Sequence, residues 1–326
     1  LSSSSAASDV YKRQPHTAQL VPILLLDSAK IQESNYKEGK PWKHAQVVAM
    51  VYGTQDAENT IALLQTVRLD ETFSPANGIS VKYIHAAHVL GAASIEVEFG
   101  GKKVVFSGDI GRRNHDLIGG FDLDYRSEVD YVVMESLYGG KVHPDRKESV
   151  QELINAVNET LERGGSVFIP CFAVQRTQEL LNDFKLAKQS GALGSDVPVW
   201  LDSPMAQRVT QIYHEALDHA EDSLFDFEEL HWVSNFRQSQ KISRRPGQII
   251  MAGSGMADGG RILEHLVTNL GNSKNTVIFV GYQAEGTIGR QLVDGATEIV
   301  VEDKLVQVKA KICLLYTSDA ADEEDS

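Results

Sequence analysis

The sequence predicts an α/β protein with two regions, and three observations lead to that prediction. Hairpin-like strands dominate up to about residue 144, whereas strands and helices alternate from about residue 145 onward. Alternating β and α elements of this length are typical of a parallel sheet covered by helices. The chain has 326 residues, of which 42% are hydrophobic, so it is long enough for one large or two medium-sized cores.

The first region begins with two segments of helical apolar spacing, residues 16–33 and 56–67, and we expect a helix in each. Residues 79–87 (ISVKYIHAA) then predict a strand. These three elements are followed by more β structure.

Residues 94–99 and 102–109 predict a hairpin closed by Gly100 and Gly101, a two-residue turn suited to positive φ. Apolar and polar residues alternate along the first of these strands, so we expect one face of the hairpin to be wet. Residues 104–107 (VVFS) and 130–135 (DYVVME) read as buried strands because of their continuous apolar runs.

The second region begins with a helical stripe that Gly164 and Gly165 end. The stripe consists of Val150, Leu153, Ile154, Val157 and Leu161. Strands and helices then alternate, which predicts a doubly wound, mostly parallel sheet. The expected strands are SVFIPCFAV, VPVWLD, QIIMAG and TVIFVGY, with helices at 175–188, 206–219 and 261–270 between them.

Composition narrows the class of protein. The net charge of −14 weighs against broad nucleic-acid affinity, so any phosphate binding must be local. No apolar run is long enough to span a membrane, and two cysteines argue against a disulfide framework. Residues 1–14 and 313–326 resemble translated sequencing-adapter read-through, with disordered tails as the alternative.

Three residues of metal-site type end three predicted strands. They are His88, Asp109 and Glu135. Each has a plain structural alternative: a hydrogen-bonded histidine, an aspartate that caps a turn, and an ordinary strand-end acid. Their convergence on one β region is stronger evidence for a site than any one of them.

The blocks HAAHVLGAAS, FSGDIGR and MESLYGG, in this order, resemble signature blocks of the metallo-β-lactamase fold, specifically its β-CASP branch of RNA- and DNA-processing nucleases. The segments IPCFAVQRTQELL, WLDSPMA, MAGSGMADGGRILEHL and VIFVGYQAEGTIGRQLVDGA resemble that branch's inserted domain. The resemblance implies a partial αββα metallo-β-lactamase domain over 15–144 and a β-CASP α/β domain over 145–312. It is closest to bacterial and archaeal RNA exonucleases, which are related to the eukaryotic pre-mRNA 3′ cleavage endonuclease.

By this resemblance, His88 matches a zinc ligand, Asp109 a carboxylate that bridges two zinc ions, and Glu135 an acid that orients a histidine for proton transfer. His85 matches no ligand position and takes the structural interpretation. The family usually has glycine where this chain has Ala87. Two zinc ions would supply a hydroxide nucleophile and neutralise charge on the phosphoryl oxygens.

The stretch MAGSGMADGG, residues 251–260, does not have the spacing of a dinucleotide-binding loop. We expect instead a cradle of backbone N–H groups that holds an RNA phosphate at a helix start. The predicted phosphate-binding residues are Ser254, Gly255, Met256, Gly259, Gly260, Arg176 and Arg290. For the two arginines, solvated positions on a helix face are the alternative.

None of the ten histidines stands in the H-x-H-x-D-H block that supplies the family's first zinc ligands. We therefore expect a fragment whose metal site is incomplete, from a cytoplasmic zinc ribonuclease that acts on single-stranded RNA in the cleft between its domains. No membrane association is expected, a homodimer stays open, and endonuclease and 5′-exonuclease activity are not distinguished. A non-catalytic β-CASP scaffold subunit is the alternative; another hydrolase of the fold, such as a thioesterase, is disfavoured by the α/β insert.

Overall fold

The structure is a computed structural model that describes residues 11–39, 50–121, 128–136, 145–217 and 225–315. The chain divides into two compact units, residues 1–135 (unit 1) and 136–326 (unit 2), and each is described by itself. The domain boundary predicted after residue 144 falls at the end of a segment outside the described residues, so it stays a prediction. No helix of the described residues is long and apolar enough to cross a membrane.

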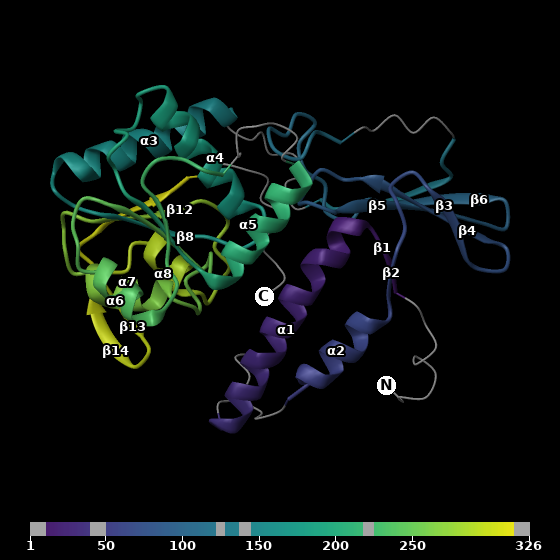
Figure 1. The fold of residues 1–326 in the computed structure, drawn as a ribbon, viewed down its shortest axis with the longest axis horizontal. Helices are drawn as coiled ribbons and strands as arrows, with labels where there is room; N and C mark the ends of the chain where they lie inside the picture. Colours follow the sequence, from purple (N-terminus) through teal and green to yellow (C-terminus); the bar gives the residue numbers. More distant parts are fainter. Residues whose placement is uncertain (1–10, 40–49, 122–127, 137–144, 218–224, 316–326) are drawn as a thin grey trace. The chain divides into compact units, whose positions relative to one another are not determined.

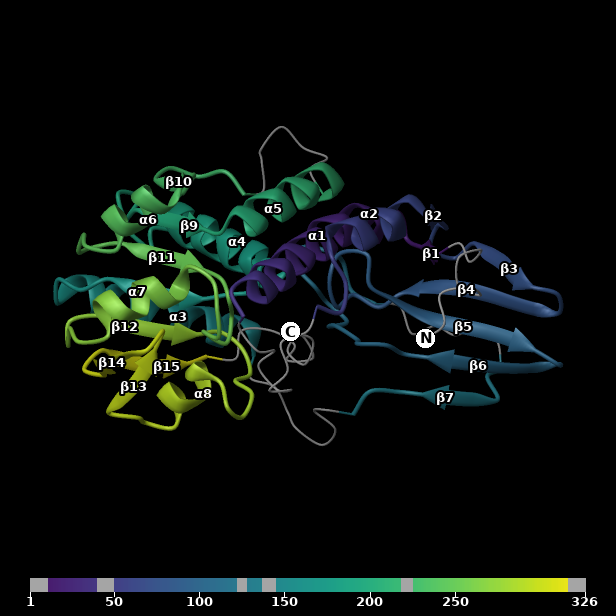
Figure 2. The same ribbon diagram turned by 90° about the horizontal axis from the view of Figure 1, so that it is seen from below.

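Unit 1 is built around a five-stranded sheet of order β3-β4-β5-β6-β7 (Figures 1 and 2). β3 (Thr72–Ala76), β4 (Ile79–His85), β5 (Ala93–Phe99) and β6 (Lys102–Phe106) are antiparallel neighbours, and β7 (Tyr131–Val133) pairs parallel to β6. The predicted hairpin is confirmed, since Phe99 pairs with Lys102 and the two glycines between them have φ of 59° and 72°. These angles suit a turn of type I′.

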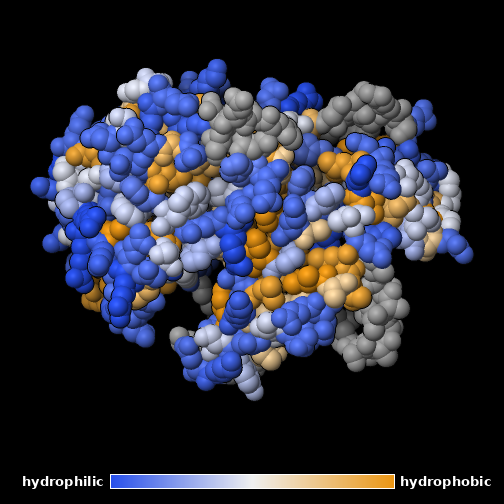
Figure 3. Space-filling model, viewed as in Figure 1, coloured by the Kyte–Doolittle hydropathy of each residue, from blue (hydrophilic) through white to orange (hydrophobic). Residues whose placement is uncertain are grey.

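In the described residues of unit 1, two helices and a short strand pair accompany the sheet. α1 (Pro15–Lys37) confirms the first predicted helix, and Figure 3 shows hydrophobic residues gathered along it. α2 (Thr54–Ala62) is shorter than predicted, because Leu64–Thr66 form β2, which pairs parallel with β1 (Tyr11–Arg13). That partner lies about 50 residues away in the sequence, beyond the reach of a local pattern.

The predicted burial of the strands in unit 1 is wrong. The side chains of Tyr131, Val132 and Val133 are 59%, 61% and 53% exposed, because β7 is an edge strand on which no described element packs. On β6 only Val105 is buried. One face of the hairpin is exposed to solvent, as predicted. The exposed face carries apolar side chains, with Phe99 63% exposed.

Unit 2 confirms the predicted parallel sheet. Its order is β10-β9-β11-β8-β12-β15, and every neighbouring pair is parallel. The strands are β8 (Val167–Pro170), β9 (Val199–Asp202), β10 (Leu230–Trp232), β11 (Ile249–Ala252), β12 (Thr276–Phe279) and β15 (Lys311–Leu314). The short β10 and β15 were not predicted, and they are the two edges of the sheet.

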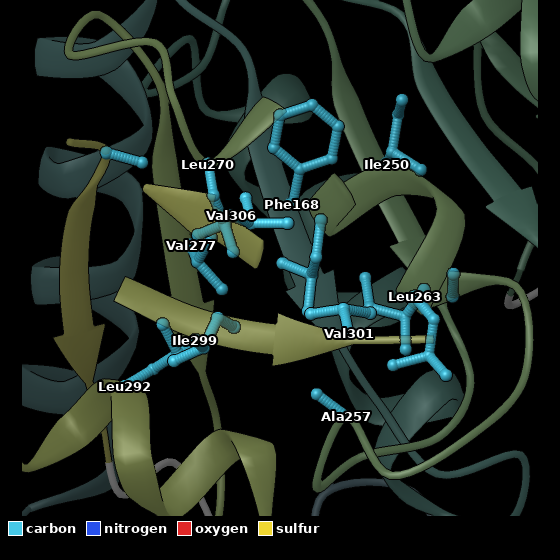
Figure 4. Close-up of a cluster of buried hydrophobic side chains, with 14 of the residues drawn as sticks. Phe168, Ile250, Ala257, Leu263, Leu270, Val277, Leu292, Ile299, Val301 and Val306 are labelled. Carbon is cyan, nitrogen blue, oxygen red and sulfur yellow. The ribbon is translucent and has the colours of Figure 1, made fainter. Parts of the chain in front are cut away.

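Helices cover both faces of this sheet (Figure 1). One face carries α3 (Arg146–Glu162), α4 (Arg176–Gln189) and α5 (Pro204–Leu217); the other carries α6 (Phe236–Ile242), α7 (Ile262–Asn269) and α8 (Ile288–Val293). The hairpin of β13 (Glu298–Val301) and β14 (Lys304–Gln307) extends the second layer. The core of that layer packs Phe168 and Ile250 of the sheet against Leu263, Val301 and their neighbours (Figure 4).

Candidate functional site

The three residues predicted from strand ends lie in the loops at one end of the unit 1 sheet. His88 follows β4, Asp109 follows β6 and Glu135 follows β7. The Nε2 atom of His88 is 3.8 Å from Oδ2 of Asp109, and their side chains are 7% and 58% exposed. A buried imidazole therefore faces a solvent-accessible carboxylate, which is an arrangement that can share a cation.

Hydrogen bonds fix the loop that presents Asp109. Glu135 Oε1 accepts from the N–H of Ile110 at 2.6 Å, and the N–H of Glu135 donates to Ser107 Oγ at 3.0 Å. Ser107 in turn donates its N–H to the carbonyl oxygen of Val133 at 2.8 Å. Glu135 thus holds the residue after Asp109 and ties the end of β7 to the loop after β6.

A close backbone approach joins the same loop to the histidine segment. The N–H of Gly111 donates to the carbonyl oxygen of Ala86 at 2.9 Å, and a Cβ at Gly111 would lie 1.7 Å from the carbonyl oxygen of Ala87. Only glycine fits at that position. Ala87 is fully buried with φ of 55°, a left-handed conformation that favours the glycine typical of the family.

The donor types of His88 and Asp109 suit zinc, but two donors do not close a tetrahedral site. Among the described residues, no group of three or more His, Cys, Asp or Glu side chains could hold a metal ion. His85 faces elsewhere, since its Nε2 lies 3.4 Å from the carbonyl oxygen of Gly119. His88 and Asp109 are therefore of the right chemical type to bind a metal ion, but two ligands are fewer than a closed site needs.

The predicted phosphate loop, residues 253–260, follows β11 at the carboxyl end of the unit 2 sheet. It folds back on itself: Ser254 N–H donates to the carbonyl oxygen of Gly259 at 3.0 Å, and Ser254 Oγ accepts from the N–H of Asp258 at 3.0 Å. A Cβ at Gly255 would lie 2.5 Å from the ring of Phe172, so this glycine is required for packing.

Some N–H groups of the loop remain available for a ligand. In the part of the chain that the structure describes, those of Gly255, Met256, Gly259 and Gly260 donate to no acceptor. Gly255 and Met256 are buried, however, whereas Gly259 is half-buried and Gly260 exposed. The acid Asp258, which the sequence interpretation left out, accepts the N–H of Ile288 at 3.2 Å and places a negative charge in the loop.

The two predicted arginines differ. Arg176 is 2% exposed and donates to Glu179 Oε2 at 2.9 Å, so it is neither a surface phosphate ligand nor a solvated helix residue. Burial with a paired carboxylate contradicts both predictions for it. Arg290 is 42% exposed and donates through Nε to Asp294 at 2.9 Å. Hydrogen bonding to Asp294 raises the pKa of the Arg290 guanidinium, and a phosphate would have to compete with this carboxylate.

The sequence interpretation missed a buried polar cluster behind the loop. Asp202, at the end of β9, is fully buried and accepts hydrogen bonds from Ser239 of α6, from Arg261 and, at 2.8 Å, from His265 Nε2 of α7. Burial raises the pKa of the Asp202 carboxyl, but these hydrogen bonds outweigh it and hold the pKa below its usual value. The signal was present: Asp202 ends an apolar strand in WLDSPMA, as Asp109 and Glu135 end theirs.

Comparison with known proteins gives the family. Residues 177–292 match the Beta-Casp domain. The chain is 29% identical to ribonuclease TTHA0252 of Thermus thermophilus over 94% of its own length and 70% of that protein's. It is 31% identical to an RNase J-like protein of Methanocaldococcus jannaschii (86% and 67%) and 31% identical to transcription termination factor FttA of Pyrococcus abyssi (87% and 44%).

The matches to the three relatives span both units. The Beta-Casp match lies within unit 2, which contains the parallel sheet. The mixed sheet of unit 1 and the parallel sheet of unit 2 agree with the fold class that the resemblance predicted. The chain belongs to the β-CASP family of RNA-processing nucleases with a metallo-β-lactamase fold.

Proposed function

We propose that this protein is a zinc-dependent ribonuclease that hydrolyses RNA phosphodiester bonds. The observation that carries the proposal is the pairing of His88 Nε2 with Asp109 Oδ2 at 3.8 Å, beside the loop that Glu135 holds. The relatives named ribonuclease and RNase J-like protein support the reaction class and the substrate.

His88 and Asp109 are the residues that would hold the metal, and no H-x-H-x-D-H block occurs in the 326 residues. When bound, zinc supplies a nucleophile at neutral pH by acidifying water and neutralises charge on the phosphoryl oxygens. Asp109 suits this role because its carboxylate is exposed while its backbone is fixed. His88 suits it because burial keeps its ring in one place.

Glu135 is proposed as a positioning residue. Its Oε1 fixes Ile110, and its proposed further role is to orient a histidine that gives a proton to the leaving oxygen. On the RNA side, we propose that Ser254, Gly259 and Gly260 bind a phosphate, with Arg290 as a further contact.

The first test is the reading frame of the gene on both sides of this chain. An H-x-H-x-D-H block just upstream is expected, and its absence would favour the non-catalytic scaffold. The protein that includes these blocks, called here the extended protein, is then assayed for zinc content and for cleavage of labelled single-stranded RNA.

Asp109→Ala in the extended protein should lower both zinc content and cleavage rate, the rate by at least about a hundredfold for loss of a metal-site carboxylate. Asp116→Ala is the matched control, because Asp116 is an exposed acid in the same loop region. Equal cleavage by the wild type and Asp109→Ala would refute the metal-binding role of Asp109.

A further inference from the structure

α6 and the turn after it carry a concentration of positive charge in an acidic protein. The chain has 45 acidic and 31 basic residues, yet no Asp or Glu occurs between Leu230 and Ala257. That stretch contains Arg237, Lys241, Arg244 and Arg245, all exposed.

The charges lie on one side of the helix. Ser239 and Ile242 face inward, where Ser239 Oγ donates to Asp202 and Ile242 joins the core. Arg237 and Lys241 have the i, i+4 spacing of the opposite, exposed side, and Arg244 and Arg245 follow in the turn after the helix. At 1.5 Å per residue, Arg237 and Lys241 lie about 6 Å apart along the axis, and the basic turn follows directly, so one extended polyanion can contact the helix and the turn.

Within the described parts of the chain, these basic side chains have no acidic partner. In the described residues, none of the four makes an ion pair or a side-chain hydrogen bond. By contrast, the exposed bases Lys102, Arg290 and Lys311 are each paired with an acid. Basic side chains without partners attract an anionic ligand without first breaking an ion pair.

Aromatic rings lie on the same side of the sheet. Phe236, at the start of α6, is 52% exposed. His231 stacks on Trp200 with ring centroids 4.4 Å apart and an interplanar angle of 28°. These two are register partners on the face that α6 covers, and the His231 side chain is 36% exposed on edge strand β10.

We propose that α6, its C-terminal turn and this aromatic pair form a second binding surface for single-stranded RNA. Cationic side chains that follow a backbone, with aromatic rings for the bases, are how proteins bind single strands without sequence preference. A membrane is the weaker fit, since a seven-residue helix with one exposed apolar side chain buries little in lipid.

The basic turn that ends this surface lies apart from the phosphate loop. The loop follows the last residue of β11, at the carboxyl end of the parallel sheet, whereas Arg244 and Arg245 precede the first residue of β11, at the other end. The inference rests on the proposed function, because it takes RNA as the substrate. The α6 surface would be a second contact for an RNA strand that extends beyond the phosphate loop.

The test measures binding of a labelled oligouridylate of about 30 nucleotides by fluorescence anisotropy at several salt concentrations. The triple variant R237Q/K241Q/R244Q is compared with K274Q/K304Q/K309Q, which removes three exposed, unpaired lysines elsewhere in unit 2. Each single-strand phosphate contact contributes about 0.7 to the slope of log affinity against log salt, so the first triple should lower the slope by about 2. Between 1 M and 0.1 M salt, the affinity of this triple variant therefore falls about a hundredfold behind that of the wild type. The lysine triple should bind as the wild type does.

Stacking is tested by Phe236→Ala, with RNA and inorganic polyphosphate as the two ligands. The variant should weaken RNA binding about tenfold and leave polyphosphate binding unchanged, because polyphosphate has no bases. An unchanged affinity for RNA would mean a general anion surface and would overturn the RNA proposal.

The two proposals fail differently. If the wild type binds no RNA at all, the proposed function fails with this one. If the wild type binds RNA and both triple variants have the same affinity and salt dependence as the wild type, only the α6 surface is refuted. Circular dichroism of each variant checks that its secondary-structure content equals that of the wild type.

Discussion

Asp109 in unit 1 and Asp202 in unit 2 follow the same sequence pattern and reach opposite environments. Each is a carboxylate that follows an apolar run: Asp202 is the last residue of β9, and Asp109 lies three residues after the end of β6. Asp109 has a side chain that is 58% exposed and lies 3.8 Å from one histidine. Asp202 is fully buried and accepts hydrogen bonds from a serine, an arginine and a histidine.

The difference shows what distinguishes a candidate metal ligand from a structural acid. The oxygens of Asp202 are satisfied by α6 and α7, which pack over its strand, so little remains for a ligand. Asp109 is held through its neighbours' backbone, while its own oxygens stay accessible. Four experiments can break or sharpen this comparison.

The largest effect is expected from Asp202→Ala. Removing this carboxylate leaves Arg261 and His265 in place without their acceptor, which typically costs about 3–5 kcal/mol for a buried ionic network. Asp109→Ala, an exposed change, should alter the free energy of unfolding by no more than about 0.5 kcal/mol. Urea denaturation followed by circular dichroism measures both, and equal losses would remove the distinction.

Gly111→Ala should be the next most damaging change. Its Cβ would lie 1.7 Å from the carbonyl oxygen of Ala87, so the backbone beside His88 must move. Such overpacking costs about 1–3 kcal/mol. Gly259→Ala is the matched control in unit 2, since nothing lies within 4 Å of its Cβ position. Thermal unfolding compares the two, and a tolerated Gly111→Ala would show that this approach is not tight.

The pH dependence of stability tests the buried cluster alone. Because the pKa of Asp202 is held below its usual 3.8, its contribution is present above about pH 4 and is lost as the pH falls through the lower folded value. Asp202→Asn should therefore flatten the acid limb of the stability profile below about pH 4. An unchanged limb would mean that other carboxylates control acid unfolding.

The smallest effect is expected from Ala87→Gly. The left-handed φ of 55° costs Ala87 about 1–2 kcal/mol of strain in the folded state. Glycine removes this strain, but part of the gain is lost because glycine raises the conformational entropy of the unfolded chain. A net gain of about 0.5–1 kcal/mol should appear as a raised urea midpoint. A destabilised variant would indicate that the methyl group of Ala87 packs more favourably than its backbone suggests.

Local pattern predicted most of unit 2, and less of unit 1. In unit 2 the apolar runs of β8, β9, β11 and β12 are buried on both faces by helices, so periodicity and burial agree. In unit 1 the apolar run of β7 looks the same but lies at the sheet edge and is exposed, and on β6 only Val105 is buried. Whether an apolar strand is covered depends on distant partners, as the pairing of β1 with β2 also shows.

The candidate site divides in the same way. Strand-end spacing placed His88, Asp109 and Glu135 in neighbouring loops. It did not reveal that Arg176 is buried against Glu179, because the local sequence of a helix does not show which of its arginines points inward. Nor did it separate Asp202 from Asp109, since Ser239 and His265 reach Asp202 from 37 and 63 residues away.

The most direct test of the account is the zinc-dependent shift of the thermal midpoint in three versions of the extended protein. For the wild type, zinc at 100 times its Kd should add about 2.7 kcal/mol of stability and raise the midpoint. Asp109→Asn should keep the zinc-free midpoint and lose the shift. Asp202→Asn should lower the zinc-free midpoint and keep the shift. If Asp109→Asn retains the full shift, Asp109 is not a metal ligand and the central claim is contradicted.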